Sequence, residues 1–325
     1  MPHAVQDWQS RIGRRVTLRD LHILSAVVRA GSMAKAATLL AMSQSAVSES
    51  IAHLEDAVRV RLLDRSVRGV EPTIYASVLL KREHAVFDEL QQGIKEIEYL
   101  TDPSAGEVRL ACTEIQSYGY LPTAIAQMSQ RHPQVAVRVT PLNTEALELP
   151  ALQERSVDFV IARIPQSYRN DDLDIEVLAA DSLMVIVGAQ SAWARKRKVT
   201  LPELVNERWI LPPTPYIRSV MKEAFEAYGV PPPAERITTQ SIQLRIRLLA
   251  TGQFVSILAD SVLQENAKRW GLKALPLELS VKPPPWAIVK LKNRTVSPVV
   301  QIFIDHLKEV AKSRLTRERD RKGST

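Results

Sequence analysis

The sequence predicts a multidomain chain of the α+β and α/β classes: a helical N-terminal domain, a long helix and a C-terminal α/β domain. Three patterns along the chain support this prediction. Two short helical segments joined by a tight turn occupy residues 31–54, a regular helical repeat covers 73–100, and strand-like and helical segments alternate from 106 onwards. A chain of 325 residues is long enough for two or three domains.

The composition excludes several classes of protein. Apolar residues make up 45% and charged residues 24%, as in ordinary globular proteins. No run of about 18 apolar residues occurs, so we expect no membrane span. The first 15 residues lack the apolar core of a secretory signal. Cys112 is the only cysteine, which precludes an intrachain disulfide and fits the reducing cytoplasm, where we expect the protein to act.

The second helix within residues 31–54 has two contrasting faces. Ser43 is placed to cap it, and Val47, Ile51 and Leu54 recur at i, i+4 and i+7, which predicts that this face is buried. The opposite face carries small polar side chains. A short polar face after a tight turn can approach base edges closely, so we expect this helix to enter a DNA major groove.

A hairpin after this helix completes the predicted DNA-binding surface. Residues 60–65 and 67–70 form its two strands, and their arginines are placed to meet the phosphate backbone, as in a wing. The residues that we expect to contact DNA are Ser32, Lys35, Ser43, Gln44, Ser45, Ser48, Glu49, His53, Arg65 and Arg68.

A long helix is predicted from Thr73, which can cap it, to about Leu100. Apolar residues step by four and three along it, with a polar interruption at Glu83, which is typical of a heptad seam. A helix of about 28 residues is roughly 42 Å long, too long to bury its seam on a small domain. We therefore favour pairing with a second subunit over packing on its own C-terminal domain. The predicted dimer contacts are Leu80, Phe87, Leu90, Ile94 and Ile97.

Residues 101–106 have the composition of a hinge, and the periodicity changes after them. Short apolar runs alternate with helical segments there, which predicts parallel sheets covered on both faces, and the block is long enough for two lobes. Strands are predicted at 108–112, 135–140, 157–162, 183–188, 209–211, 255–258 and 287–289, and helices at 121–131, 146–154, 217–228, 243–250, 261–270 and 297–312.

These features resemble the LysR-type transcriptional regulators. The resemblance is carried, at matching spacing, by residues 18–21, Gly31-Ser32, Ala36-Ala37, residues 43–48, Leu54-Glu55 and residues 61–65, and it continues weakly beyond them. Three departures occur: Glu49 replaces a usual Arg, Arg59 replaces a usual Gly, and residues 72–76 replace Leu-Thr-Glu-Ala-Gly. Glu49 puts the usual phosphate or base contact of that Arg in doubt, although a carboxylate can accept a hydrogen bond from cytosine.

The resemblance implies a winged helix-turn-helix, a linker helix and a bilobed α/β effector domain similar to the periplasmic-binding-protein fold. The chain crosses between the lobes twice in that fold, and we expect the crossings near 164–168 and 271–273. The predicted boundaries are 1–16 for an extension, 17–72 for the DNA-binding domain, 73–101 for the helix, 106–313 for the effector domain (lobe I 106–165 and 272–313, lobe II 166–271) and 314–325 for a basic tail.

The predicted effector site lies at strand ends, where ligands gather in open α/β sheets. Thr113 matches the Ser or Thr that usually contacts the effector in the family; capping a helix is an alternative and compatible role. Arg163 can clamp a carboxylate or form a salt bridge to Asp171, Asp172 or Asp174, and it favours an organic anion as effector. The predicted effector contacts are Thr113, Gln116, Ser117, Arg163, Tyr216, Arg218, Thr239 and Gln240, with helix capping as the competing role in the second lobe.

Catalytic, metal and cofactor sites are not predicted. The six histidines are scattered and none has ligand spacing to Cys112. The sequence contains no phosphate-binding Gly-rich loop, Gly-flanked Ser nucleophile or HExxH motif. Cys112 has no resolving partner, which favours buried packing over redox sensing.

The predicted function is therefore a sequence-specific DNA-binding transcriptional regulator, not an enzyme, controlled by a small-molecule effector bound between two α/β lobes. Its expected partners are double-stranded operator DNA, an organic anion, a second copy of the chain and RNA polymerase, with a tetramer implied by the resemblance and no membrane. An enzyme or solute-binding protein using the bilobed domain is the main alternative, and a non-specific DNA-packaging protein is a third.

Overall fold

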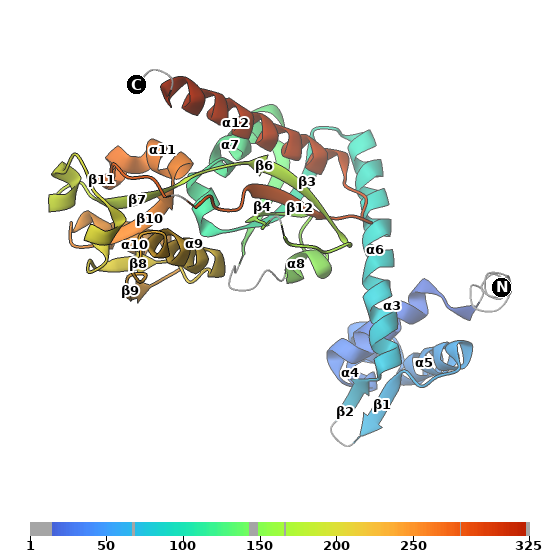
Figure 1. Ribbon diagram of the computed structural model, residues 1–325. Coiled ribbons are helices and arrows are strands. Elements are labelled where there is room, and N and C mark those ends of the chain that lie inside the picture. The colour runs from blue at the N-terminus through green and yellow to red at the C-terminus, as the bar shows by residue number, and fades with distance from the viewer. Residues whose placement is uncertain (1–14, 67–68, 143–148, 166, 280, 323–325) are drawn as a thin grey trace, which may run out of the picture. The chain divides into compact units, whose positions relative to one another are not determined.

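A computed structural model describes residues 15–66, 69–142, 149–165, 167–279 and 281–322, with the side chains of 65–66 and 314–322 left aside. The chain divides into two compact units, Met1–Gly93 and Ile94–Thr325 (Figure 1). No helix in the described part of the chain is long and apolar enough to cross a membrane.

The N-terminal unit is a helix-turn-helix followed by a two-stranded wing. Thr17 and Asp20 form a capping box that starts its first helix, and Gly31 ends that helix in the left-handed conformation, with φ of 64°. The two wing strands pair antiparallel. The elements are α3 (Leu18–Ala30), α4 (Met33–Leu39), α5 (Gln44–Val58), β1 (Leu63–Ser66) and β2 (Gly69–Pro72).

One apolar cluster holds this unit together. Val47, Ile51 and Leu54 of α5 have no exposed surface, as their spacing predicts. The cluster also takes in the start of α6 (Ile74–Thr101), where Ala76 is buried and Leu80 packs partly buried against it. Leu80, one of the predicted dimer contacts, therefore packs in part within its own chain.

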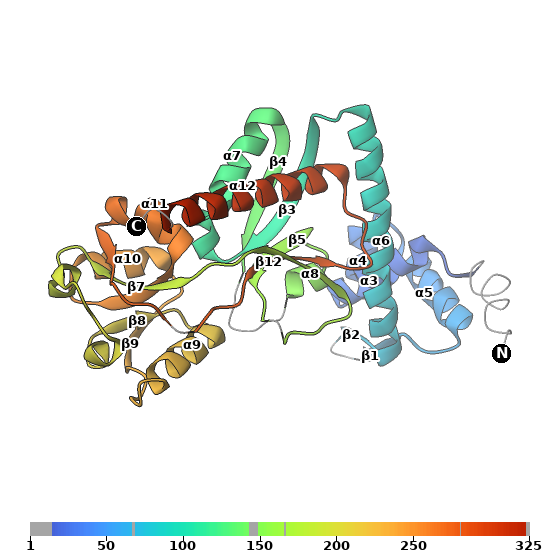
Figure 2. The ribbon, with the colours of Figure 1, turned by 45° about the horizontal axis from the view of Figure 1, so that its top comes forward.

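The described strands of the C-terminal unit form two five-stranded sheets, one per lobe (Figure 2). Lobe I has the strand order β4-β3-β5-β12-β6 and lobe II the order β11-β7-β10-β8-β9. Lobe I contains β3 (Ala105–Cys112), β4 (Gln134–Pro141), β5 (Phe159–Arg163), β6 (Leu173–Ala179) and β12 (Trp286–Leu291). Lobe II contains β7 (Leu183–Gly188), β8 (Trp209–Leu211), β9 (Glu235–Thr238), β10 (Val255–Ala259) and β11 (Leu272–Ala274).

Helices cover both sheets on both faces, so each lobe has two apolar clusters. In lobe I, α12 runs beside α7 (Figure 2). The helices are α7 (Leu121–Arg131), α8 (Pro150–Gln153), α9 (Pro215–Glu226), α10 (Ile242–Ala250), α11 (Asp260–Trp270) and α12 (Pro298–Lys322), with short 3₁₀ turns η2 (Glu114–Tyr118), η3 (Ala192–Arg195) and η4 (Leu201–Leu204). Because α12 continues to Lys322, the segment predicted as a basic tail from 314 is helical for most of its length.

Both sheets are mixed, not parallel as predicted. β3 pairs parallel with β4 and β5, but β12 is antiparallel to β5 and β6. In lobe II, β7 is antiparallel to β10 and β11. The strands that run against their neighbours, β7 and β12, each follow a lobe crossing and not a covering helix, so nothing forces them into the parallel direction.

The two crossings lie farther along the chain than predicted. β6 belongs to the lobe I sheet, so the first crossing falls at 180–182 and not at 164–168. β11 pairs with β7 of lobe II, so the second falls at 275–285 and not at 271–273. Lobe II is therefore the continuous segment between these crossings, and lobe I is built from the chain on either side.

Candidate DNA-binding surface and effector cleft

The start of α5 presents a short polar surface. The Ser43 hydroxyl accepts a hydrogen bond from Ala46 N at 3.1 Å and lies 2.9 Å from the Ser45 hydroxyl, which fixes the first turn. Gln44, Ser45 and Glu49 are exposed on this helix. Serine and glutamine side chains there can reach base edges without blocking close approach.

The remaining predicted DNA contacts surround this turn. Lys35 is exposed on α4, whereas Ser32 and Ser48 are half-buried. Ser32 occupies the N-cap of α4 without a side-chain cap bond among the described residues. Exposed His53 has its Nδ1 3.8 Å from Asp20 Oδ2.

Asp20 connects α3 to α5 at the base of the recognition helix. Its carboxylate accepts hydrogen bonds from Ser50 Oγ at 2.6 Å and Thr17 Oγ1 at 2.7 Å. Burial raises its pKa, but these bonds and the nearby His53 hold the net pKa below the ordinary value. The ionised carboxylate therefore fixes the orientation of α5.

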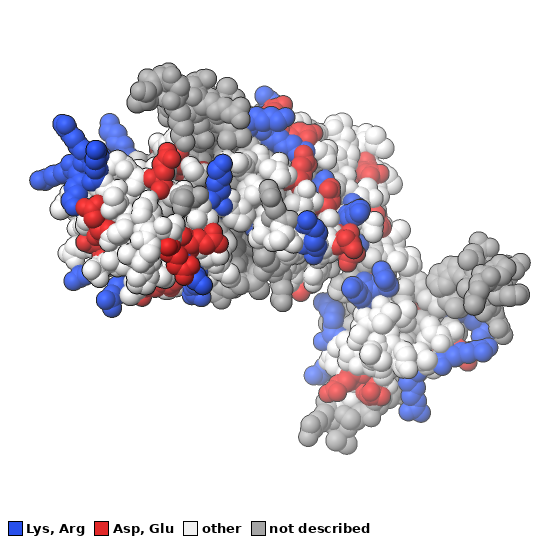
Figure 3. Space-filling model, viewed as in Figure 1, with Lys and Arg blue, Asp and Glu red and all other residues white. Residues whose placement is uncertain are grey.

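The wing carries the predicted phosphate contacts. Arg65 lies on β1 opposite Val70, and Arg68 lies outside the described residues. Basic side chains occur on several sides of the N-terminal unit, with acidic side chains near its lower edge in Figure 3. Arg59, where the family usually has Gly, ends α5 in the left-handed conformation, with φ of 57°, which explains why Gly is usual there.

The later part of α6 carries an exposed apolar stripe. Val86, Leu90, Ile94 and Ile97 recur at spacings of four, four and three, and they are 40%, 48%, 56% and 65% exposed. Phe87, also predicted at the dimer contact, is half-buried, and its ring lies 5.8 Å from that of His22. An apolar stripe of this length on a helix is typical of an interaction surface.

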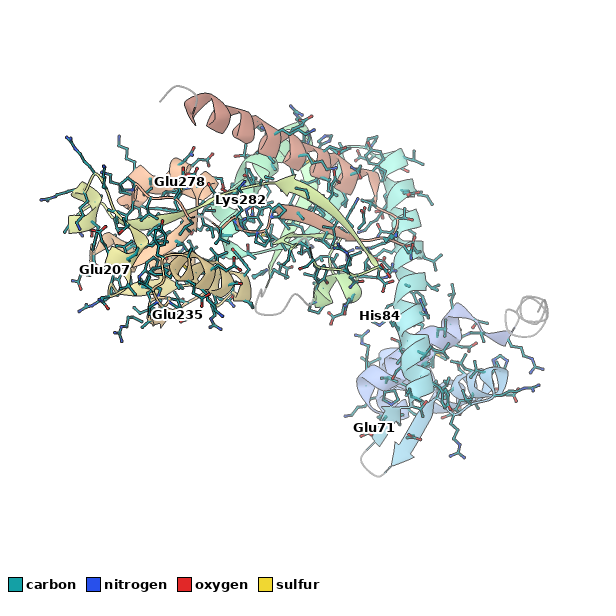
Figure 4. The ribbon with its side chains drawn as sticks, in the orientation of Figure 1. Glu71, His84, Glu207, Glu235, Glu278 and Lys282 are labelled. Atoms are coloured by element: carbon teal, nitrogen blue, oxygen red, sulfur yellow. The ribbon has the colours of Figure 1, made fainter. Side chains whose placement is uncertain are left out.

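The main cavity lies between the two lobes and has a volume of about 1150 Å³. Of the predicted effector contacts, five line it: Thr113, Ser117, Arg163, Tyr216 and Gln240. Three lie outside the described lining. Gln116 is buried, Thr239 Oγ1 accepts a bond from Ser241 N, and Arg218 pairs with Glu235 at the lower edge of lobe II in Figure 4.

Two threonines face this cavity from opposite lobes. Thr113 precedes η2 of lobe I, and Thr214 precedes α9 of lobe II, both at N-cap positions. Neither forms a side-chain cap bond, and both hydroxyl oxygens are buried without a hydrogen-bond partner within the described parts of the chain. Capping therefore does not occupy the Thr113 hydroxyl, which leaves it available to a ligand.

Arg163 sits at the junction of the lobes. Its Nη2 lies 3.6 Å from Asp181 Oδ2 on the first crossing, and its Nη1 donates to the Pro284 carbonyl on the second at 2.6 Å. The guanidinium also stacks on Trp286, 4.4 Å from the ring centroid. Asp181, and not the predicted Asp171, Asp172 or Asp174, is thus its acidic partner, because the crossing lies after β6.

Arg245 of α10 also lines the cavity and was not predicted from the sequence. It is 6% exposed, and no described residue bonds to its buried Nε. Burial lowers its pKa to about 10, so the guanidinium stays charged at neutral pH. The sequence signal was available: Ile242, Arg245 and Leu249 share one buried stripe, and an arginine there is unusual.

Polar and aromatic contacts close the lobes beside the cavity. Glu114 of lobe I accepts a hydrogen bond from Ile242 N of lobe II at 3.0 Å. The Tyr118 ring packs edge-on against Trp270 at 5.1 Å, and Asn266 Nδ2 donates to the Tyr118 carbonyl at 3.4 Å. The η2 turn thus holds the N-terminal end of α10 and the face of α11.

Cys112 is a buried wall residue of this cavity, and burial raises its pKa to about 11. Its thiol is therefore almost fully protonated at neutral pH, which disfavours redox sensing. Among the residues that the structure describes, no group of three or more His, Cys, Asp or Glu side chains could hold a metal ion.

Comparison with known proteins identifies both units. Residues 18–76 match the model of the bacterial regulatory helix-turn-helix protein, lysR family, and residues 101–312 match that of the LysR substrate binding domain. The transcriptional regulator GbpR of Azospirillum brasilense is 25% identical over 93% of this chain and 89% of its own.

Solved structures share the fold. CrgA, a LysR-type transcriptional regulator from Neisseria meningitidis, has a TM-score of 0.55 at 21% identity, covering 91% of this chain and 99% of its own. CbnR in complex with its target DNA has a TM-score of 0.51 at 21% identity, covering 91% of this chain and 100% of its own. This chain, with its helix-turn-helix and two-lobed substrate binding domain, belongs to the LysR family of transcriptional regulators.

Proposed function

We propose that this LysR-type regulator reads operator DNA as a homodimer through α5 and the wing, and that an organic anion between its lobes controls DNA binding. The family matches support a DNA-binding transcriptional regulator with an effector-binding domain. The observation that carries the finer proposal is the short polar face of α5, buried on its other side at Val47, Ile51 and Leu54.

Base recognition is assigned to α5, and phosphate binding is assigned to the wing. Gel-shift titrations on the DNA flanking the protein's own gene test this assignment. Ser45→Trp should abolish specific binding because a bulky side chain blocks the groove, and each lost base contact should cost about 1–3 kcal/mol. Arg65→Ala should weaken specific and non-specific binding alike and lower the salt slope by about one. The reverse pattern would contradict the assignment.

The proposed dimer contact is the exposed apolar stripe of α6. Ile94→Glu would bury a carboxylate in the paired state, so sedimentation should detect a smaller species. Gln91→Glu adds the same charge at an exposed polar position of α6 and should leave the assembly unchanged. An unchanged mass for Ile94→Glu would instead indicate that the stripe packs within one chain. Association of dimers into tetramers would appear in the same experiment as a concentration-dependent heavier species.

The proposed effector binds between Thr113 and Ser117 of lobe I and the α9 and α10 side of lobe II. Since Glu114 already joins the lobes through Ile242 N, a ligand in the cavity would favour one relative arrangement of the lobes over others. A change of this kind alters DNA affinity only if the two arrangements bind DNA differently. DNase footprints with and without the ligand test that coupling.

The protein is proposed to act in the cytoplasm, with DNA and RNA polymerase as macromolecular partners, and not as an enzyme. The curated relative GbpR is named a transcriptional regulator, which supports a role without catalysis. The alternative reading, an enzyme or solute-binding protein, is not favoured, because it leaves the matched DNA-binding unit at residues 18–76 unexplained.

A further inference from the structure

We propose that the effector is a carboxylate with a bulky apolar body, and that Arg245 binds its carboxylate group. The inference rests on the proposed function in that this ligand is the controlling effector. It differs from the expectation drawn from the sequence, which gave the anion-binding role to Arg163.

The two buried arginines of the cavity differ in how their charge is balanced. The Arg163 and Asp181 side chains are both almost fully buried, 3.6 Å apart, and Arg163 also bonds to the Pro284 carbonyl. This guanidinium is therefore already neutralised and fixed. Its Nε and Nη2 lack a hydrogen-bond partner in the described structure, as does the buried Nε of Arg245. The difference is that Arg245 forms no ion pair with a described acid, so its charge is not balanced in this way.

The carboxylate that acts electrostatically on Arg245, that of Glu114, is committed elsewhere. Glu114 attracts the Arg245 guanidinium electrostatically, but it is exposed and its Oε2 accepts from Ile242 N at 3.0 Å. The other charged lining residues, Lys282 (labelled in Figure 4) and Glu223, are exposed, so water screens their charges. An anionic group inside the cavity would thus satisfy Arg245 at the smallest desolvation cost.

Two further donors to an anionic head group line the same cavity as Arg245. Thr113 Oγ1 and Thr214 Oγ1 are buried, line the same cavity from opposite lobes, and have no hydrogen-bond partner in the described structure. Buried polar atoms are normally paired, so these two hydroxyls and Arg245 Nε, beside the unpaired Nε and Nη2 of Arg163, indicate an acceptor group supplied by a ligand. A carboxylate provides acceptors for the two hydroxyls and Arg245.

The rest of the lining determines the body of the ligand. Apolar side chains dominate the walls, among them Ile115, Val139, Leu142, Ile217, Val220 and Trp286. The volume of about 1150 Å³ lies slightly above the usual range of small-molecule sites, about 300–1,000 Å³, so acetate or a similarly small anion would leave most of the cavity empty. A sugar or nucleotide would desolvate many hydroxyls against these walls, whereas an aromatic or long aliphatic body would not.

Matched acid and amide pairs test the head group on the full-length protein by calorimetric titration. The probes are acetate, hexanoate, octanoate, 4-phenylbutyrate and 1-naphthylacetate, each compared with its primary amide. Affinity should rise with the size of the apolar body, and the larger acids should bind about tenfold or more tightly than their amides, as expected for charge-assisted hydrogen bonds. Equal binding of acids and amides, or binding by none of the ten compounds, would overturn the proposal.

Variants assign the preference to Arg245. Arg245→Gln should remove the preference for acid over amide, while Arg247→Gln, which removes the same charge from an exposed position of α10, should retain it. Thr214→Val keeps the shape and removes an unpaired hydroxyl, so it should weaken acid binding about threefold to tenfold even if Arg245→Gln fails to fold. A preference for acid that survives in Arg245→Gln, or an unchanged affinity in Thr214→Val, would contradict the assignment.

The same samples separate this inference from the proposed function. Parent, Arg245→Gln and Arg247→Gln should bind the DNA flanking the gene equally well without a probe, because Arg245 lies in the effector unit. If the parent protein does not bind this DNA, the proposed function is rejected, regardless of whether the acids bind. Acid binding that leaves the footprint unchanged would retain the site and reject its role as the effector site.

Discussion

Replacing Asp181 by asparagine should destabilise the C-terminal unit by about 3–5 kcal/mol, because it leaves the Arg163 guanidinium buried without a counter-charge. The two side chains are 2% and 1% exposed, and Nη2 and Oδ2 are 3.6 Å apart. At an effective dielectric constant of about 20, unit charges at that separation attract by roughly 4–5 kcal/mol. The hydrogen bond from Arg163 to the neutral Pro284 carbonyl cannot replace that attraction.

Urea unfolding followed by tryptophan fluorescence measures the loss, since Trp286 stacks on Arg163. Asp174→Asn is the matched control: Asp174 lies 3.3 Å from Lys290 but is 55% exposed, so its loss should be at most about 1 kcal/mol. Replacing the buried pair together, Arg163→Met with Asp181→Leu, should recover most of the stability. The reasoning is refuted if Asp181→Asn costs no more than Asp174→Asn, or if the double variant loses the sum of the single losses.

Three further predictions concern other parts of the chain. Arg59→Gly should stabilise the N-terminal unit by about 1 kcal/mol, because glycine adopts the left-handed backbone conformation of this position without strain. A melting temperature no higher than that of the control Arg61→Gly would contradict this. Burial raises the pKa of the Cys112 thiol to about 11, so at pH 8 it should react slowly with an aromatic disulfide in the folded protein. The reaction should be at least about a hundredfold faster in the urea-unfolded protein, and equal rates in the two states would count against burial of the thiol. The folded-state pKa of Asp20 lies below its ordinary value, so the stabilising contribution of its carboxylate is present above about pH 4 and is lost as the pH falls through the folded-state pKa. Asp20→Asn should therefore flatten the acid unfolding profile measured by circular dichroism.

Elements with strong local signals could be predicted from the sequence. The caps at Ser43 and Thr73 and the apolar spacing of α5 placed the helices of the N-terminal unit, and the long apolar runs of β7 and β8 gave their observed bounds. β6, β9 and β11 were missed. β6 alternates Leu, Asp, Ile, Glu and Val, and its acidic positions concealed an edge strand whose pairing partner lies more than 100 residues away. Such a pairing leaves little local signal.

The site was predictable where it follows from strand ends and not where it depends on tertiary contacts. Arg163 ends β5, Thr113 directly follows β3, and both line the cavity. Closeness in sequence favours Asp171, Asp172 and Asp174 as partners of Arg163, whereas the observed pair with Asp181 depends on where the chain leaves lobe I after β6. Arg245 was missed because helical periodicity places it on a buried stripe of α10. A charged residue on such a stripe indicates either that the helix has been wrongly assigned or that a ligand binds there.

The path of the chain through lobe I determines the order in which the strands of its sheet are synthesised. β12 is the strand between β5 and β6, and β6 pairs with no other described strand. Lobe II, residues 183–274, is complete on the ribosome before β12 at Trp286–Leu291 has been made. Until then β6 and the open side of β5 remain unpaired edges, which are prone to pair with other chains. A translation stop before Trp286 would therefore yield a folded lobe II attached to an aggregation-prone half-sheet, so about the last eighth of the chain completes a fold begun near residue 105.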